Sequence, residues 1–103
     1  IKKVIKKNLI EMINISHKNG AIVLLIGVQL PPNYGRQYTD DFEKMFSDLA
    51  KKYNINLITG SIVEMVSSNM MQADGIHPNK AGHELIEKEV WQEIKPILKN
   101  IID

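Results

Sequence analysis

The stretch Ala21-Ile22-Val23-Leu24-Leu25-Ile26-Gly27-Val28 decides the fold. It is continuously apolar and rich in β-branched residues, which is typical of a strand covered on both faces in a parallel sheet. It is also the longest apolar run of the chain, well short of the ~18 residues that a membrane span needs. We therefore expect a central strand over 21–28 and no membrane span.

An amphipathic segment precedes this strand. Residues 1–17 predict a helix, because their apolar side chains share one stripe and their lysines lie mostly opposite, on a face that we expect to be solvated. The expected stripe consists of Ile1, Val4, Ile5, Leu9, Met12, Ile13 and Ser16. Gly20 is suited to terminate the helix, since glycine tolerates the left-handed conformation that follows many helices.

A second helix and a second strand follow. The apolar stripe over 40–53 predicts a helix, and Thr39 or Asp40 can cap its start. Asn54 is a possible left-handed terminator, and 55–59 predicts a short strand. The helix between two strands makes a βαβ unit, which is right-handed by strong precedent.

In the last third of the chain we expect two helices joined by a loop. Apolar spacing over 79–101 predicts a long C-terminal helix that Asn79 caps and that Pro96 either kinks or ends. A short helix is expected over 62–68, with Ser61 as its cap. The fold class is therefore α/β.

Composition excludes some classes of function. Thirteen basic and twelve acidic residues give a formal charge of +1, too balanced for a surface that binds nucleic acid. The chain has no cysteine, so disulfides and thiolate sites are excluded while the compartment stays undetermined. It opens at Ile1 inside a periodic segment, which suggests a cut that leaves any signal peptide out of view.

The loop Asp74-Gly75-Ile76-His77-Pro78-Asn79 has the composition of a catalytic loop. A short turn through Gly75 can fold the Asp74 carboxylate onto Nδ1 of His77, which would leave Nε2 free to accept a proton from a nucleophile. Two alternatives remain open for the residues alone. One is a capped turn without catalytic role, and the other is a metal site, for which two ligands are too few.

A second loop leaves the central strand at the edge where α/β sheets bind ligands. Residues 29–38 hold two prolines, a glycine and Asn33, which indicate irregular structure. On position alone, Leu30, Pro31 and Tyr34 belong either to a rigid turn or to a binding loop.

The chain resembles the SGNH or GDSL hydrolases in the segment Gln29-Leu30-Pro31-Pro32-Asn33-Tyr34-Gly35-Arg36, in the pattern Asp74-x-x-His77, and in the spacing between them. The similarity is to the bacterial branch of thioesterase I, lysophospholipase and arylesterase enzymes. It implies a partial three-layer α/β/α, flavodoxin-like fold, with residues 1–103 as the C-terminal part of one domain. Neither Gly-Asp-Ser nor Gly-x-Asn-Asp occurs in the chain, so the resemblance places the nucleophile and oxyanion hole outside it.

This resemblance implies the acid/base half of a serine hydrolase. His77 would be the general base and acid, Asp74 would orient it, and Leu30, Pro31 and Tyr34 would border the acyl pocket. The implied substrates are acyl esters, lysophospholipids or acyl-CoA thioesters, without metal or cofactor, and the implied compartment is periplasmic or secreted. The isolated chain is expected to be inactive.

A different class of function stays open, namely a non-catalytic assembly module or a truncated remnant. Two strands rarely form a stable sheet, and the resembling family builds five. We therefore expect the chain to pair with a complementary N-terminal fragment, or with a second copy, through the unpaired edge of 21–28.

Overall fold

The computed structural model describes residues 1–59, 65 and 68–102. The chain divides into two compact units, Ile1–Thr59 and Gly60–Asp103. The short helix expected over 62–68 falls largely outside the described residues, and so does its expected cap Ser61.

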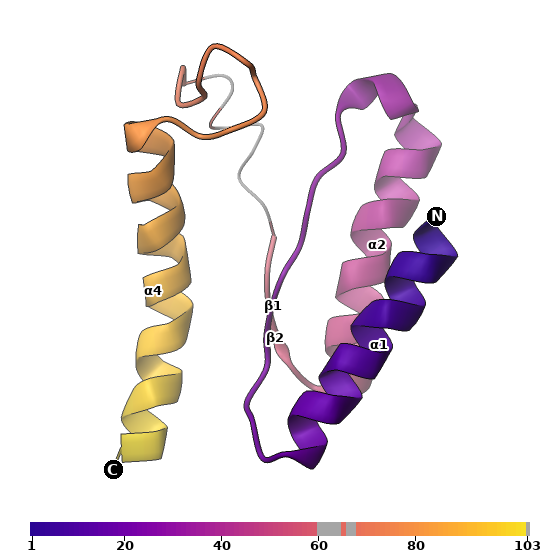
Figure 1. Cartoon of the computed structure of the whole chain (residues 1–103), viewed down its shortest axis with the longest axis vertical. Helices are drawn as coiled ribbons and strands as arrows, with labels where there is room; N and C mark the ends of the chain where they lie inside the picture. The colour runs from indigo at the N-terminus through magenta and orange to yellow at the C-terminus, as the bar shows by residue number, and fades with distance from the viewer. Residues whose placement is uncertain (60–64, 66–67, 103) are drawn as a thin grey trace. The chain divides into compact units, whose positions relative to one another are not determined.

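The sheet of the first unit has two parallel strands (Figure 1). Strand β1, Leu24–Ile26, pairs with β2, Asn56–Ile58, so that Leu25 lies opposite Leu57. The Gly27 amide adds one more bond to the Ile58 carbonyl at 2.8 Å. These pairings confirm the α/β class and both predicted strands, although each strand is shorter than expected.

Helix α1 spans Lys2–Lys18, as predicted within one residue. At its C-terminus the Gly20 amide donates to the His17 carbonyl and the Ala21 amide donates to the Ser16 carbonyl, at 3.0 and 2.9 Å. This pair of bonds is a Schellman motif, and Gly20 provides the positive φ of 81° that the motif requires. The predicted terminator is confirmed.

Helix α2 spans Arg36–Tyr53, so the predicted start at 40 with a cap at Thr39 or Asp40 is wrong. A 3₁₀ turn, η1 (Pro32–Tyr34), and Gly35 with a φ of 88° turn the chain directly into the helix. The Thr39 hydroxyl consequently lies inside the first turn and donates to the Arg36 carbonyl at 3.0 Å. Asn54 is left-handed, with φ 51°, and confirms the predicted end.

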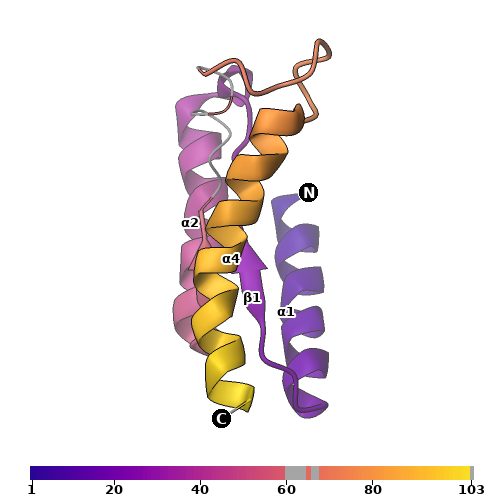
Figure 2. The same cartoon turned by 90° about the vertical axis from the view of Figure 1, so that its left-hand side faces the viewer.

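Helices α1 and α2 lie on the same side of the sheet, where they enclose the core of the first unit (Figures 1 and 2). Leu49 is its most deeply buried member, with 1% of its surface exposed. The core cluster consists of Leu25, Phe42, Met45, Phe46 and Leu49. The α1 stripe is rotated from the predicted one, because Ile10 packs against this cluster whereas Val4 and Met12 are 61% and 55% exposed.

The predicted burial of both faces of strand 21–28 is wrong for this chain. Leu25 is buried against the helices, but Ile22, Ile26 and Val28 are 60%, 49% and 56% exposed. Side chains alternate between the two faces of a strand, so packing α1 and α2 on one face leaves the other uncovered by them. The first unit by itself therefore buries only some of the apolar side chains of 21–28.

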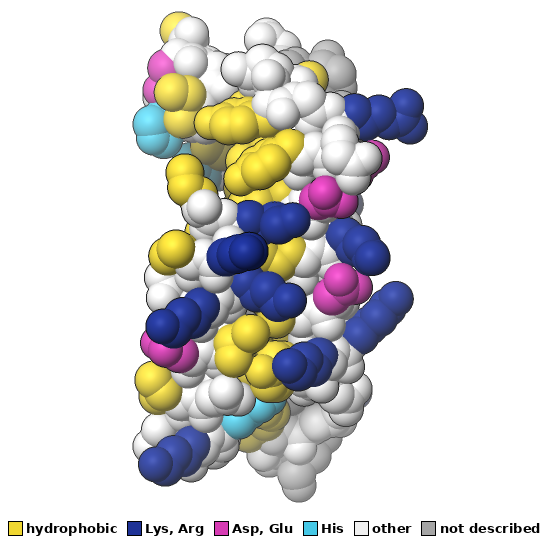
Figure 3. All heavy atoms as spheres, turned by 90° about the vertical axis from the view of Figure 1, so that its right-hand side faces the viewer, with side chains coloured by type: hydrophobic (Ala, Val, Ile, Leu, Met, Phe, Trp, Pro, Cys, Tyr) yellow, Lys and Arg dark blue, Asp and Glu magenta, His cyan; other side chains and the backbone are white. Residues whose placement is uncertain are grey.

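Lysine side chains spread over the outer surface of the first unit, mixed with acidic ones (Figure 3). On α1, Lys3, Lys6 and Lys7 are all exposed. This arrangement confirms the predicted solvated face of the first helix.

The second unit contains helix α4, Lys80–Ile102. Asn79 caps it as predicted, because its side-chain Oδ1 accepts the Gly82 amide at 3.0 Å. The helix continues through Pro96 to Ile102, so the predicted alternative that Pro96 ends it is wrong. Proline removes a single helical amide, and the remaining bonds carry the helix onward. No helix in the described ranges is long and apolar enough to cross a membrane.

Candidate acid/base site

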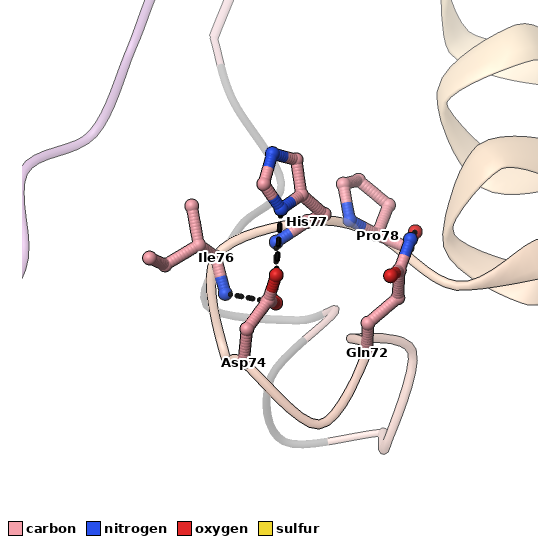
Figure 4. Close-up of polar contacts among 5 residues, drawn as sticks. All are labelled: Gln72, Asp74, Ile76, His77 and Pro78. Carbon is pink, nitrogen blue, oxygen red and sulfur yellow. Dashed lines mark hydrogen bonds and ion pairs between the residues drawn. The ribbon is translucent and has the colours of Figure 1, made fainter.

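The candidate site lies in the loop directly before α4 (Figure 4). Oδ1 of Asp74 accepts the backbone amides of Ile76 and His77, at 2.9 and 3.1 Å. Gly75 makes this turn possible with a φ of 67°, a conformation that side chains with a Cβ rarely adopt. The carboxylate is thus fixed by the loop that it closes.

The second carboxylate oxygen holds the imidazole. Oδ2 of Asp74 lies 2.7 Å from Nδ1 of His77, as the sequence predicted. Nε2 of His77 points away from Asp74 (Figure 4). The two side chains are 43% and 67% exposed, so hydrogen bonds rather than packing orient the ring.

The base of the loop is fastened to the start of α4. Met71 and Pro78 form an antiparallel bridge, and the Asn79 amide donates to the Met70 carbonyl at 2.8 Å. Gly82 is buried against this bridge, where an added Cβ would meet the Met70 carbonyl and lie 2.8 Å from Cβ of Pro78. The loop therefore has a fixed position on its own helix.

Gln72 is a part of the loop that sequence reasoning missed. Its side-chain amide donates to the Pro78 carbonyl at 3.0 Å, and its backbone amide donates to the His77 carbonyl at 2.7 Å. No local pattern signalled these contacts, because the bonded groups lie five and six residues further along the chain.

The pairing also changes the acidity of Asp74. The hydrogen bond from His77, followed by the amides of Ile76 and His77, lowers the pKa of Asp74 from 3.8 to about 2. Hydrogen bonds to the charged form of a carboxyl favour that form. Asp74 is therefore an anion throughout the neutral range, as a partner of an imidazolium must be.

A carbon-detected NMR titration of the Asp74 carboxyl should give a midpoint of about 2. Because the folded pKa lies below the unfolded value, the pair stabilises the loop above pH ~4 and loses this contribution as the pH falls through ~2. His77→Phe removes the largest cause and should move the midpoint back toward 3.8. A wild-type midpoint near 3.8 would contradict the geometry.

The residues predicted to border the acyl pocket lie in the first unit. Leu30 is half-buried and packs against the core cluster, whereas Pro31 is exposed. Tyr34 is 57% exposed and stacks on Tyr38 with 6.1 Å between the ring centroids. Their role in substrate binding stays a prediction.

Metal ligation is an alternative role for Asp74 and His77 on their residue types alone. Within the described part of the chain, no group of three or more His, Cys, Asp or Glu side chains lies close enough together to hold a metal ion.

Comparisons of sequence find relatives among bacterial esterases. The chain is 38% identical to esterase TesA of Pseudomonas aeruginosa over 96 residues, which are 91% of this chain and 47% of TesA. It is 32% identical over 78 residues to thioesterase 1/protease 1/lysophospholipase L1 of Escherichia coli, covering 75% of this chain and 38% of that protein. No protein-family model matches the chain.

Comparisons of structure agree with these relatives. The psychrotrophic esterase EstA of Pseudoalteromonas superposes with a TM-score of 0.83 at 30% identity, over 96% of this chain and 55% of EstA. The SGNH-hydrolase family esterase AlinE4 shares the fold, with a TM-score of 0.65 at 23% identity over 95% of this chain and 52% of AlinE4. The chain is therefore similar to bacterial esterases in sequence and shares the fold of an SGNH-hydrolase family esterase. It spans about half the length of the relatives that it matches.

Proposed function

We propose that this chain is the acid/base half of an SGNH-type serine hydrolase that cleaves acyl esters or thioesters. The observation that carries the proposal is the 2.7 Å contact between Oδ2 of Asp74 and Nδ1 of His77, which leaves Nε2 accessible. A carboxylate on Nδ1 fixes the tautomer whose Nε2 accepts a proton and stabilises the imidazolium that results.

The proposed chemistry requires a nucleophile and an oxyanion hole, and the motifs that supply them, Gly-Asp-Ser and Gly-x-Asn-Asp, do not occur in this chain. A serine hydroxyl on the complementary part would attack the acyl carbonyl while Nε2 of His77 takes its proton. The same proton would then go to the leaving alcohol or thiol as the acyl–serine bond replaces the original ester or thioester bond. Water, activated by His77 in turn, would release the acid. The oxyanion donors would also come from the complementary part.

The substrate class follows from the names of the relatives. They are an esterase and a thioesterase that is also named a lysophospholipase, so acyl esters, lysophospholipids and acyl thioesters are the proposed substrates. Leu30, Pro31 and Tyr34 are the proposed acyl-binding residues. The exposed ring of Tyr34, which stacks on Tyr38, offers an apolar surface for the acyl chain of the substrate.

The proposed partner is the complementary N-terminal part of the domain. The exposed side chains of Ile22, Ile26 and Val28 support it, as does the two-stranded sheet, in which only one edge of β1 is paired by β2. Such an edge is a template for a further strand. The alternative partner is a second copy of the chain, paired through 21–28. Light scattering would then show a dimer, and adding the complementary part would not dissociate that dimer.

A chimera tests the function. Residues 1–103 replace the matching C-terminal segment of P. aeruginosa esterase TesA, and hydrolysis of p-nitrophenyl esters and acyl-CoA is measured. We expect turnover by this chimera, and none above free imidazole by the 103-residue chain alone, because neither Gly-Asp-Ser nor Gly-x-Asn-Asp occurs in the chain. A folded chimera without turnover would favour the rival function, a non-catalytic assembly module or remnant.

A covalent probe separates the two halves further. EstA has been crystallised inhibited by monoethylphosphonate. A serine-directed phosphonate should label the chimera and leave the isolated chain unlabelled. Labelling of the isolated chain would overturn the proposal and place a nucleophile within it.

A further inference from the structure

Two residues hold His77 in the loop: Asp74 binds its side chain, and Gln72 binds its backbone carbonyl. Asp74 accepts hydrogen bonds from the imidazole and from the amides of Ile76 and His77 (Figure 4). Gln72 donates to the carbonyls of His77 and Pro78. The Gln72 carbonyl also accepts the Gly75 amide at 2.9 Å, which begins the turn. Gln72 is thus hydrogen-bonded to three residues of the loop: Gly75, His77 and Pro78.

The position of the His77–Pro78 segment depends on backbone hydrogen bonds more than on side-chain packing. The His77 side chain is 67% exposed, so little packing limits its motion. Pro78 has no amide and can only accept a backbone hydrogen bond, so its carbonyl is its one polar backbone group. Within the described part of the chain, the carbonyls of His77 and Pro78 both accept from Gln72, one from its main-chain amide and one from its side-chain amide.

We propose that Gln72 is a positioning residue for His77. Its side-chain amide fixes the Pro78 carbonyl and thereby the backbone from which the imidazole projects toward the Asp74 carboxylate. This inference rests on the proposed function for its catalytic consequence, but its structural part can be measured without activity. Loss of the amide donor should let the imidazole drift from Asp74, and small displacements of a catalytic group cost rate.

Gln72→Met tests the inference, because methionine keeps the length and neutrality of the side chain and removes the donor. In the 103-residue chain, we expect the Asp74 carboxyl midpoint to rise from about 2 toward 3.8 as its bond to His77 loosens. The matched control is Gln92→Met, at an exposed position of α4, which should leave the midpoint unchanged. The far-UV spectrum of both variants should match the parent.

The second test of the inference measures the activity of Gln72→Met in the TesA chimera. Gln72→Met should lower kcat about tenfold with little change in KM, since a lost hydrogen bond of ordinary strength acts here on orientation. An unmoved Asp74 midpoint, or an unchanged kcat in an active chimera, would overturn the inference. If the parent chimera is inactive while the Asp74 midpoint moves in Gln72→Met, the proposed function fails and the positioning of His77 by Gln72 stands.

Discussion

Replacing His77 by alanine in the TesA chimera should lower kcat and kcat/KM by about a thousandfold or more, with KM changed little. General base and acid are both lost when the imidazole is removed, and triad members act as a unit whose loss is not compensated by the others. Equal losses in kcat and kcat/KM indicate a group that acts in the transition state, which initial rates on a p-nitrophenyl ester measure directly.

A second histidine in the same unit provides the control for this experiment. His83 is exposed in the first turn of α4 and forms no part of the proposed site. His83→Ala should keep kcat within about twofold of the parent, as surface substitutions usually do. Full activity of His77→Ala, or equal losses in the two variants, would remove His77 from the mechanism.

Replacing Leu49 by alanine should destabilise the first unit by about 2–5 kcal/mol, the usual range for a buried leucine reduced to alanine. Leu49 is 1% exposed and belongs to the cluster between α2, β1 and the inner face of α1. Domains are stable by only ~5–15 kcal/mol, so this loss is a large part of the total. Urea unfolding followed by far-UV circular dichroism and by amide signals of residues 1–59 measures the shift in midpoint.

The matched control removes a comparable side chain from the surface. Ile15 on α1 is 62% exposed, so Ile15→Ala should change the free energy of unfolding by less than about 0.5 kcal/mol. If both variants shift the urea midpoint equally, burial of Leu49 makes no special contribution to the stability of the first unit.

Local chemistry accounts for the parts of the structure that were predicted correctly. The contact between Asp74 and His77 forms within four consecutive residues, and Gly75 supplies the one conformation that the turn demands. The helix ends at Gly20 and Asn54 are similarly set by a few adjacent backbone groups. Such features need no distant partner, so the sequence contains all of their causes.

Contacts between elements decided the rest. Which face of α1 is buried depends on where α2 and the sheet lie, so Ile10 packs inward while Val4 and Met12 stay exposed. Apolarity alone similarly predicted strand 21–28 to be buried on both sides, although Ile26 is 49% exposed.

The sequence by itself determined the α/β class, the order of the described helices and strands, and the contact between Asp74 and His77, because periodicity and turn chemistry are local. The tertiary structure alone decided the three-residue pairing of β1 with β2, and the two bonds by which Gln72 holds the carbonyls of His77 and Pro78. These features join groups that are separated along the chain, and only the folded backbone brings their donors and acceptors within hydrogen-bonding distance.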